Sequence, residues 1–383
     1  MSLRTSTPVV LSIPPNHYES RRRISPWEKV AFREILPIFA VKTDHTVSYK
    51  SNLATISKET GYSVTTVSRV LTGQAERYRI SKGAVELITE TALRCNYHPN
   101  IVAQSLRTQK SQTVGLLVPG IDNPFFAMLS GIIINLLAER GYHTLLADSR
   151  ESQADEEQAL RMFSGRKVDG IISIPASTSA ALHEQIDRDI PVVLIDRSFD
   201  KTTLPYICTD NYAGARMASE FLLERGYRNI LAIQGIHAAM PNRERLRGFK
   251  DAMEGSGADY AVAGDAFSVE NGKREVLAAF SKPGCRHDAI FAFSSNILLG
   301  AIDAMRSLGL KAGRNVGVIS FDNNGFLDFL DPAVTRIEQP LQEAAESVVE
   351  TLFDIISRRR DGRPGGDPPQ RLLRPTLVIR ASC

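Results

Sequence analysis

The chain has little cysteine for its length, and the cysteines that it has are far apart. Four occur among 383 residues: Cys95, Cys208, Cys285 and Cys383. They form no Cys-x-x-Cys pair, and no histidine stands at the spacing of a metal ligand. These absences exclude a disulfide framework and a structural zinc site as the basis of the fold. We expect free thiols, no metal site and no cofactor.

Long apolar runs are also missing. No stretch approaches the roughly 18 consecutive apolar residues of a membrane-spanning helix. A secretory signal is not expected either, because the apolar residues 9–11 are followed at once by Ser12, Pro14 and Pro15. The Gly-rich patterns GxGxxG and GxxxxGK[ST] and the nucleophile pattern GxSxG do not occur. We therefore expect a cytoplasmic protein without a catalytic site.

What the chain does have is an uneven distribution of charge within a composition typical of globular proteins. Residues 1–50 hold eight Lys and Arg against four Asp and Glu, and residues 51–111 repeat these numbers. Residues 112–383 hold thirty against thirty-five. A basic front part suits DNA, because affinity for DNA depends largely on released counterions. Part of the excess also fits a solvated tail, since residues 1–50 contain five prolines and no sustained periodicity.

The stretch Thr55–Leu71 predicts two short helices joined by a tight turn. Gly61 suits the left-handed conformation that ends a helix, and the Ser63 hydroxyl can cap the helix that follows. In the second helix the apolar face comprises Val67, Val70 and Leu71, whereas Val64, Thr65, Ser68 and Arg69 lie near or on the outward side. Short side chains let a helix enter the major groove, and a guanidinium can bond guanine O6 and N7 together. A glycine turn between helices also occurs in ordinary globular proteins, so both interpretations remain open for this stretch alone.

A third helix is predicted over residues 81–96, with Ser81 as its cap and Val85, Ile88, Ala92 and Leu93 on one face. Pro99 then interrupts the helix. A brief helical patch at 101–107 and a polar linker follow. Three helices are enough for a small domain around a single core.

From Thr113 the pattern changes to short apolar runs that alternate with amphipathic helices. Strands are predicted at 114–118, 143–147, 170–174, 192–195, 206–208, 230–233, 289–293, 316–321 and 377–380, and helices at 125–140, 155–166, 180–188, 211–225, 243–254, 297–308 and 341–358. Such alternation predicts parallel sheets covered by helices, and its length favours two doubly wound halves. Ligands of such folds lie beyond the carboxyl ends of the strands.

With these parts in order, the sequence from about Leu53 to the end resembles the lactose/galactose repressor family. The motifs that carry the resemblance are Gly61-Tyr62-Ser63, residues 66–71, Asn96-Tyr97-x-Pro99-Asn100, Ala103-x-x-Leu106-Arg107, residues 115–119, Asn123-Pro124-Phe125-Phe126, residues 168–171, Ile195-Asp196-Arg197, Arg245-Leu246-x-Gly248-Phe249, Phe321-Asp322 and Gln339-Pro340. Residues 75–81, 97–99 and 322–330 look most like the fructose and sucrose repressors.

The resemblance implies a small all-α headpiece with a winged or plain helix-turn-helix, a hinge helix, and a two-lobed α/β core similar to periplasmic sugar-binding proteins. It implies a homodimer on a palindromic DNA operator, with pairing of dimers left open. The expected divisions are a flexible extension (1–50), a DNA-binding domain (51–98), a hinge helix and linker (99–112) and a core (113–383). Within the core, lobe 1 is expected at about 113–208 plus 340–358, and lobe 2 at about 209–339 plus 370–383.

The resemblance also assigns residues to DNA. The implied DNA-binding residues are Val64, Thr65, Thr66, Ser68, Arg69, Asn100, Ala103, Leu106 and Arg107. Val64, Thr65 and Arg69 would read the major groove, and Leu106 would enter the minor groove as an apolar wedge. The alternatives are packing of Leu106 on the core, and a phosphate contact or surface salt bridge for Arg69.

The implied ligand-binding residues are Asn123, Phe125, Phe126, Asp196, Arg197, Arg245, Ser294 and Asp322. Where many family members have an Asn-Asp pair, this chain has Ser294-Ser295-Asn296, which favours an anionic effector such as a sugar phosphate or sugar acid. The expected function is a transcriptional regulator of carbohydrate metabolism genes, a repressor by resemblance, controlled by a sugar or sugar phosphate. The rivals are a solute-binding protein without a DNA role, a regulator responding to a purine or sugar acid, and an enzyme on the same frame.

Overall fold

The computed structural model describes residues 52–97, 110–363 and 366–383. The chain divides into two compact units, residues 1–99 and 100–383. The predicted extension (1–50) and most of the predicted hinge (99–112) lie outside the described residues. No helix in the described ranges is long and apolar enough to cross a membrane.

The first unit contains three helices around a small core. They are α2 (Leu53–Thr60), α3 (Val64–Leu71) and α4 (Lys82–Arg94). Gly61 ends α2 with φ 73°, and the side chains of Asn52, Ser63 and Ser81 accept hydrogen bonds from the first turns of α2, α3 and α4. Local sequence thus sets where each helix begins.

The core of this unit contains Ile56, Val67, Val70, Ile88 and Ala92. Leu93, which the sequence places on the core face of α4, is instead 77% exposed. Five residues after Ile88, Leu93 has rotated by about 140° around the helix, whereas Ala92 returns to the same face. The prediction for Leu93 was therefore wrong.

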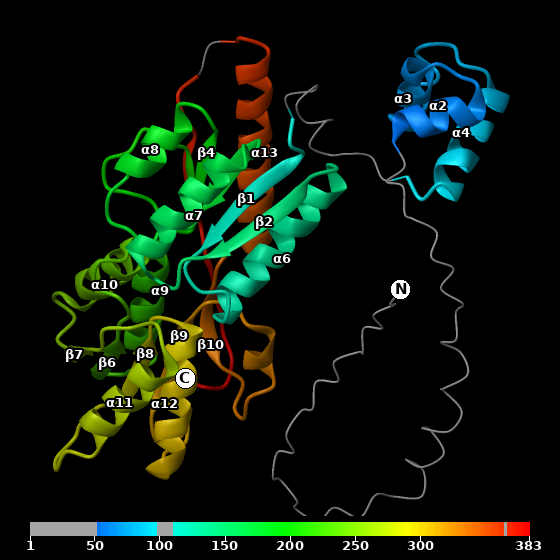
Figure 1. Ribbon diagram of the computed structural model, residues 1–383. Coiled ribbons are helices and arrows are strands. Elements are labelled where there is room, and N and C mark those ends of the chain that lie inside the picture. The colour runs from blue at the N-terminus through cyan, green and yellow to red at the C-terminus, as the bar shows by residue number, and fades with distance from the viewer. Residues whose placement is uncertain (1–51, 98–109, 364–365) are drawn as a thin grey trace, which may run out of the picture. The chain divides into compact units, whose positions relative to one another are not determined.

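The second unit has two lobes, each built on a six-stranded sheet (Figure 1). The strand orders are β11-β5-β4-β3-β1-β2 in lobe 1 and β12-β10-β9-β8-β6-β7 in lobe 2. Every pairing is parallel except that of β10 with β12. The predicted two-lobed α/β core with parallel sheets is confirmed.

Lobe 1 contains β1 (Thr113–Val118), α6 (Pro124–Glu139), β2 (His143–Asp148), α7 (Gln153–Gly165), β3 (Gly170–Ser173), α8 (Ala181–Asp187), β4 (Val192–Ile195), β5 (Tyr206–Thr209), α13 (Leu341–Arg360) and β11 (Gln370–Leu373). Lobe 2 contains α9 (Asn211–Glu224), β6 (Asn229–Ile233), α10 (Met240–Met253), β7 (Asp259–Ala263), α11 (Val269–Phe280), β8 (Ala289–Ala292), α12 (Ser295–Ser307), β9 (Gly317–Phe321), the 3-10 helix η1 (Gly325–Asp328), β10 (Thr335–Glu338) and β12 (Thr376–Val378).

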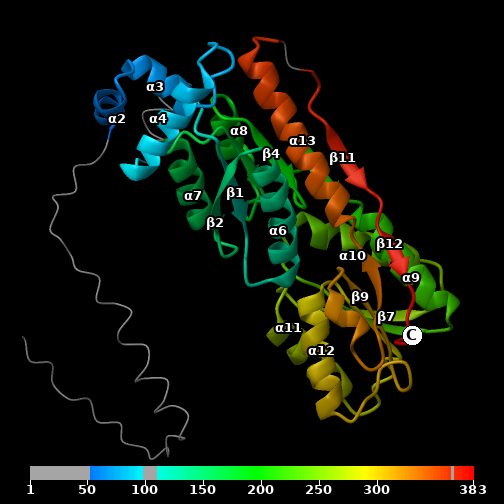
Figure 2. The same cartoon turned by 90° about the vertical axis from the view of Figure 1, so that its right-hand side faces the viewer.

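The chain passes between the lobes three times, after β5, before α13 and between β11 and β12. In Figure 2 the red segment from β11 to β12 runs from one lobe to the other. β11 pairs with β5, so residues 370–373 belong to lobe 1, not to lobe 2 as the sequence predicted. The strand has only two apolar residues, and nothing in its pattern indicates which sheet it joins.

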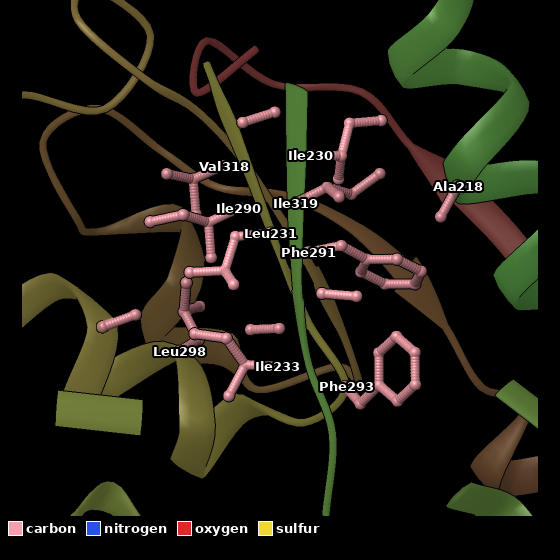
Figure 3. Close-up of a cluster of buried hydrophobic side chains, with 14 of the residues drawn as sticks. Ala218, Ile230, Leu231, Ile233, Ile290, Phe291, Phe293, Leu298, Val318 and Ile319 are labelled. Carbon is pink, nitrogen blue, oxygen red and sulfur yellow. The ribbon is translucent and has the colours of Figure 1, made fainter. Parts of the chain in front are cut away.

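Four further elements escaped prediction: β7, α11, η1 and β10. β7 is an edge strand whose residues are exposed or half-buried, and its apolar run, Tyr260–Ala263, is short and half alanine, so it is a weak strand signal. In lobe 2, successive buried side chains of a strand point to opposite faces of the sheet. Figure 3 shows Leu231, Ile290 and Val318 on one face of the sheet, and Phe291 and Phe293 on the other.

Two glycines let α11 and α12 approach each other closely. A β-carbon at Gly272 would overlap the carbonyl oxygen of Ile297, and one at Gly300 would overlap the carbonyl oxygen of Val269. Backbone atoms cannot yield as a flexible side chain can. The crossing therefore requires glycine at both positions.

We predict that Gly300→Ala lowers the free energy of unfolding of the core by about 1–3 kcal/mol, the usual cost of overpacking. Gly131→Ala is the matched control. Gly131 is also helical, but nothing lies near its added β-carbon. That control should be neutral or stabilising by about 0.5–1 kcal/mol. Urea unfolding measures both, and equal stability of the two variants would contradict the helix-crossing argument.

Candidate functional site

A cavity of about 30 Å³, here the inner cavity, lies between the two lobes of the core. Its lining consists of Asn123, Phe125, Phe126, Asp196, Arg197, Pro241, Arg245, Phe267, Ser294 and Asp322. All eight residues of the predicted ligand set are among these, although a role in binding stays a prediction for each. Pro241 and Phe267 were not singled out in the sequence. The cavity lies beyond the carboxyl ends of β1, β4, β8 and β9.

Two aspartates occupy equivalent places in the two lobes. Asp196 directly follows β4 and Asp322 directly follows β9, strands with the same position in their sheet orders. Both residues have a left-handed backbone conformation, with φ 64° for Asp196 and 79° for Asp322, and both are buried. Non-glycine residues in this conformation cost of the order of 1 kcal/mol or more and persist where surrounding structure holds them. Each lobe thus turns one carboxylate toward the cavity at a strained position.

Asp196 has an unusual protonation equilibrium. Burial raises its pKa to about 6, while Arg197 and Arg245 oppose that increase. Asp322 and Glu151 add to it through charge repulsion. No described residue donates a hydrogen bond to the Asp196 carboxylate, and its nearest cationic atom is Arg197 Nε at 3.9 Å. The carboxylate therefore keeps its capacity to accept hydrogen bonds.

Arg245 is held from several sides. Its Nε donates to Asn211 Oδ1 at 2.8 Å, and Nη1 donates to the carbonyl oxygen of Phe293. The guanidinium lies 3.7 Å from the ring centroid of Phe321, and Nη2 lies 3.7 Å from Asp322 Oδ1. Burial lowers the pKa of Arg245, and the two aspartates counteract the decrease. Two of its five N–H donors are occupied within lobe 2, and Nη2 makes no hydrogen bond with a described residue, so Nη2 is the part that can reach a ligand.

Asp322 also connects the lobes. Its Oδ2 accepts from Ser295 N at 3.2 Å, and its Oδ1 accepts from Gln339 Nε2 at 2.6 Å. Gln339 Oε1 in turn accepts from Thr209 Oγ1 at 2.7 Å. Thr209 ends β5 of lobe 1, and Gln339 immediately precedes the crossing into α13. A buried chain of polar contacts thus runs from the cavity to two of the crossings.

Arg197 is paired with a residue that the sequence analysis missed. Its Nη1 and Nη2 donate to the two carboxylate oxygens of Glu151 at 2.7 and 2.6 Å. Glu151 lies in the loop after β2, where Arg150 and Glu151 are both left-handed. The Arg197 Nε is buried without a hydrogen-bond partner among the described residues. A ligand oxygen would satisfy this donor.

Asn123 and Ser294 have a local role as helix caps. Asn123 Oδ1 accepts from Phe125 N at 3.0 Å, and Ser294 Oγ accepts from Ile297 N at 3.3 Å. They start α6 and α12, so the amino-terminal ends of two helices border the cavity. The partial positive charge at such ends favours anionic or electron-rich ligand groups.

A second space of about 120 Å³, the outer cavity, shares Arg197 with the inner one. An ion pair at this outer cavity joins Arg243 of lobe 2 to Asp200 of lobe 1. Arg243 was not singled out in the sequence, because only Arg245 was placed by a motif. The partner aspartate is distant in the chain, and no sequence spacing indicates the pairing.

A serine, a histidine and a glutamate come together inside lobe 1. Ser173 Oγ is 3.0 Å from His183 Nε2, and His183 Nδ1 is 4.0 Å from Glu156 Oε1. Burial lowers the pKa of His183, and the nearby Glu156 opposes this effect. Ser173 and His183 are completely buried, so no substrate reaches the hydroxyl. Glu156 also accepts hydrogen bonds from the amides of Ala176 and Ser177, so the cluster supports the loop that lines the outer cavity.

In the first unit, the outer face of α3 carries the predicted groove readers. Val64 is 46% exposed and Thr65 is exposed as well, whereas Thr66 is half-buried with its hydroxyl 2.9 Å from Ser63 Oγ. The Arg69 guanidinium lies 3.7 Å from the ring centroid of Tyr78. Ser68 is half-buried. Asn100, Ala103, Leu106 and Arg107 lie outside the described residues.

In the sequence, Tyr78 stood out only as part of the run 75–81 that carries the resemblance, and no contact was assigned to it. It belongs to the connection between α3 and α4, and its ring is 41% exposed. A cation–π contact of this kind contributes about 0.5–1 kcal/mol at an exposed position. The stack therefore restricts the directions that the Arg69 side chain can take.

Comparison with known proteins places this chain among regulators. Residues 219–383 match a family described as periplasmic binding protein-like domain. The ribose operon repressor of Halalkalibacterium halodurans is 30% identical over 304 residues, which cover 79% of this chain and 90% of that protein.

Two solved structures are also similar. A periplasmic binding protein/LacI transcriptional regulator from Alkaliphilus metalliredigens, complexed with D-xylulofuranose, is 28% identical with a TM-score of 0.61, covering 71% of this chain and 98% of that one. The lac repressor dimer bound to operator and the anti-inducer ONPF is 21% identical with a TM-score of 0.76, covering 87% and 98%. At that identity the likeness shows the fold alone.

We predict that Asp196→Asn removes a pH dependence of stability. In the wild type the folded pKa of about 6 exceeds the ordinary value of 3.8, so the folded carboxyl holds its proton while the unfolded one loses it. The free energy of unfolding therefore falls as pH rises from about 4 to about 6, by about 3 kcal/mol for two pKa units. Asparagine does not titrate. The free energy of unfolding of the variant, relative to that of the wild type, should therefore increase by about 3 kcal/mol between pH 4 and pH 7.

Urea unfolding at several pH values measures the difference. Asp122→Asn is the control, because Asp122 is exposed. It should follow the wild-type curve. Parallel curves for wild type and Asp196→Asn would contradict the role given to burial at this carboxyl.

Proposed function

The chain belongs to the lactose/galactose repressor (LacI) family of transcriptional regulators, and from this premise we propose a role for each of its two units. The first unit binds an operator in DNA. A sugar or sugar phosphate bound between the lobes of the core controls that binding. The observation that carries the proposal is the convergence of eight polar and aromatic residues, far apart in the chain, on one cavity between two lobes.

DNA binding is proposed for the surface of α3, with α2, the Gly61 turn and α3 as a helix-turn-helix. Val64 and Thr65 would face base edges, and Arg69 would bond a guanine through two donors. A single helix reads only a few base pairs, so a homodimer on a palindromic operator is proposed. Leu106 would act as the minor-groove wedge. Regulation of transcription puts such a protein in the cytoplasm, at the nucleoid, and requires no catalytic step.

The cavity chemistry supports a hydroxylated ring as the effector. Carboxylates and guanidinium groups bond neighbouring hydroxyls, and the Phe125 and Phe126 rings offer apolar faces. The Arg197 Nε and the amino-terminal ends of α6 and α12 suit a phosphate. The similarity to a ribose operon repressor and to a regulator complexed with D-xylulofuranose supports the same class.

Binding in this cavity implies movement of the lobes. Pockets for small molecules usually measure about 300–1,000 Å³, whereas the inner cavity measures about 30 Å³. A ligand therefore enters only when the lobes separate. The Asp200–Arg243 ion pair and the contacts of Gln339 are the bonds that such movement changes. A ligand that prefers one arrangement shifts the population toward it, and a coupling of about 1–3 kcal/mol changes operator affinity about 5- to 150-fold.

We predict that ribose, fructose or fructose 1-phosphate raises the melting temperature of the full chain in a thermal-shift assay. A sugar acid and a purine are tested in the same assay as the alternative ligands. A ligand at 100 times its Kd stabilises by about 2.7 kcal/mol. The binder should then change operator affinity by the factor given above. Asp196→Asn should weaken its binding, because a ligand hydroxyl loses a carboxylate acceptor. If operator affinity is the same with and without each of these compounds, the proposal is wrong.

We predict that Arg69→Ala loses about 1–3 kcal/mol of operator affinity at one base pair and relaxes discrimination there. Tyr78→Ala should lose part of that discrimination, because Arg69 is no longer restricted by the ring. Tyr78→Phe keeps the ring and should behave as the wild type. Binding to a series of single-base operator variants measures all three. Equal weakening on every sequence would make Arg69 a phosphate contact.

A further inference from the structure

Lobe 2 contains another cavity, here the distal cavity, of about 480 Å³. It is lined by Ile302, Met305 and Arg306, which belong to the last turns of α12. The inner cavity lies at the other end of α12, beside Ser294. A helix of 13 residues is about 20 Å long. The two cavities are therefore separate sites, and the distal one is within the size range of small-molecule pockets.

The floor of the distal cavity is apolar. Met305, Val318 and Val334 are buried beneath it. Half-buried apolar side chains form the walls: Ile302, Leu310, Ala312 and Leu330. Such a floor favours an apolar ring or chain, because burying each CH₂ group is worth about 0.8 kcal/mol.

The rim of the same cavity is basic. Arg306, Lys311 and Arg314 are exposed around it, against a single acid, Asp331. None of the three cations makes an ion pair or a side-chain hydrogen bond with another residue of the described chain. Elsewhere in lobe 2, Lys273 pairs with Asp303 at 2.8 Å. Arg306 does act on Asp303 through charge, since it helps to lower the pKa of that carboxyl. The rim thus places three exposed cations, none of them in a close ion pair among the described residues, next to an apolar floor.

The segment that carries two of these cations is already ordered. Lys311 N donates to Asn315 Oδ1 at 2.9 Å, and Gly313 N donates to the carbonyl oxygen of Val316 at 2.9 Å. Residues 311–316 form a tight turn that does not have to be organised when a ligand binds. A preorganised site loses less entropy on binding than a flexible one.

We propose that the distal cavity binds an amphipathic organic anion, an apolar ring or short chain that carries one carboxylate, sulfonate or phosphate. The apolar part occupies the floor, and the anionic group lies among Arg306, Lys311 and Arg314. The inference does not depend on the operator or on the effector of the inner cavity. Its failure is therefore distinguishable from failure of the proposed function.

The test is a fluorescence titration of the full chain with two probes of nearly the same shape. 8-Anilinonaphthalene-1-sulfonate carries an anionic group, and N-phenyl-1-naphthylamine lacks it. The sulfonate should bind saturably with one site per chain and more tightly than the neutral probe. Raising the salt concentration should weaken only the sulfonate, because exposed charges are screened. No saturable binding of the sulfonate, or equal affinities of the two probes, would overturn the proposal.

Variants assign the binding to this cavity. Ala312→Phe fills the space from the wall and should weaken the sulfonate at least tenfold. Lys311→Gln combined with Arg314→Gln should weaken it about threefold to tenfold, as expected for two exposed charges. The double variant Lys282→Gln and Arg286→Gln removes the same charge from exposed positions outside the cavity lining and should bind as the wild type. Unchanged affinity of Ala312→Phe would place the probe elsewhere and reject the site.

Discussion

The buried guanidinium of Arg245 is the group on which the geometry between the lobes depends. A buried charge is tolerated only where its donors and its charge are both matched. Asn211 from α9, the carbonyl oxygen of Phe293 after β8, and the ring of Phe321 together with Asp322 supply that match. Four elements of lobe 2 are thereby fixed at one point. Because Asp322 also accepts from Gln339, the same point holds a segment that crosses to lobe 1.

The two equivalent aspartates then differ because their surroundings differ. Asp322 is engaged by Arg245, by the Ser295 amide and by Gln339. Asp196 accepts no hydrogen bond from a described residue, its closest cationic atom is Arg197 Nε at 3.9 Å, and burial raises its pKa. The pseudo-symmetric fold thus yields one carboxylate that holds the frame and one that is available to a ligand. Perturbed groups of this kind are typical of functional sites.

Eight of the ten residues that line the inner cavity could be listed from the sequence because the family motifs assign them, and the parallel sheets could be predicted because short apolar runs alternate with helices. A role of these residues in binding stays a prediction. Asp196 and Asp322 stand directly after apolar strands, and motifs placed Arg245. Sequence reasoning failed where a contact joins residues that are far apart in the chain, because no single segment indicates such a contact. Glu151 and Asp200 are recognisable only through partners 46 and 43 residues away. β11 carries too few apolar residues to show which sheet it joins, and β7 is an edge strand whose short apolar run is half alanine. Tyr78 lay in a connection with no periodicity to interpret.

The magnitudes explain why a small effector suffices to control DNA binding. Each base contact proposed for Arg69 and Thr65 of α3 would contribute about 1–3 kcal/mol of discrimination. The stack of Arg69 on Tyr78 limits the arginine to few directions, which sharpens that contact without adding another. A coupling of about 1–3 kcal/mol between effector and operator is of the same size. The free energy by which the ligand favours one arrangement of the lobes is therefore comparable to the free energy of a whole base contact. A change in the arrangement of the core is enough to change the occupancy of the operator.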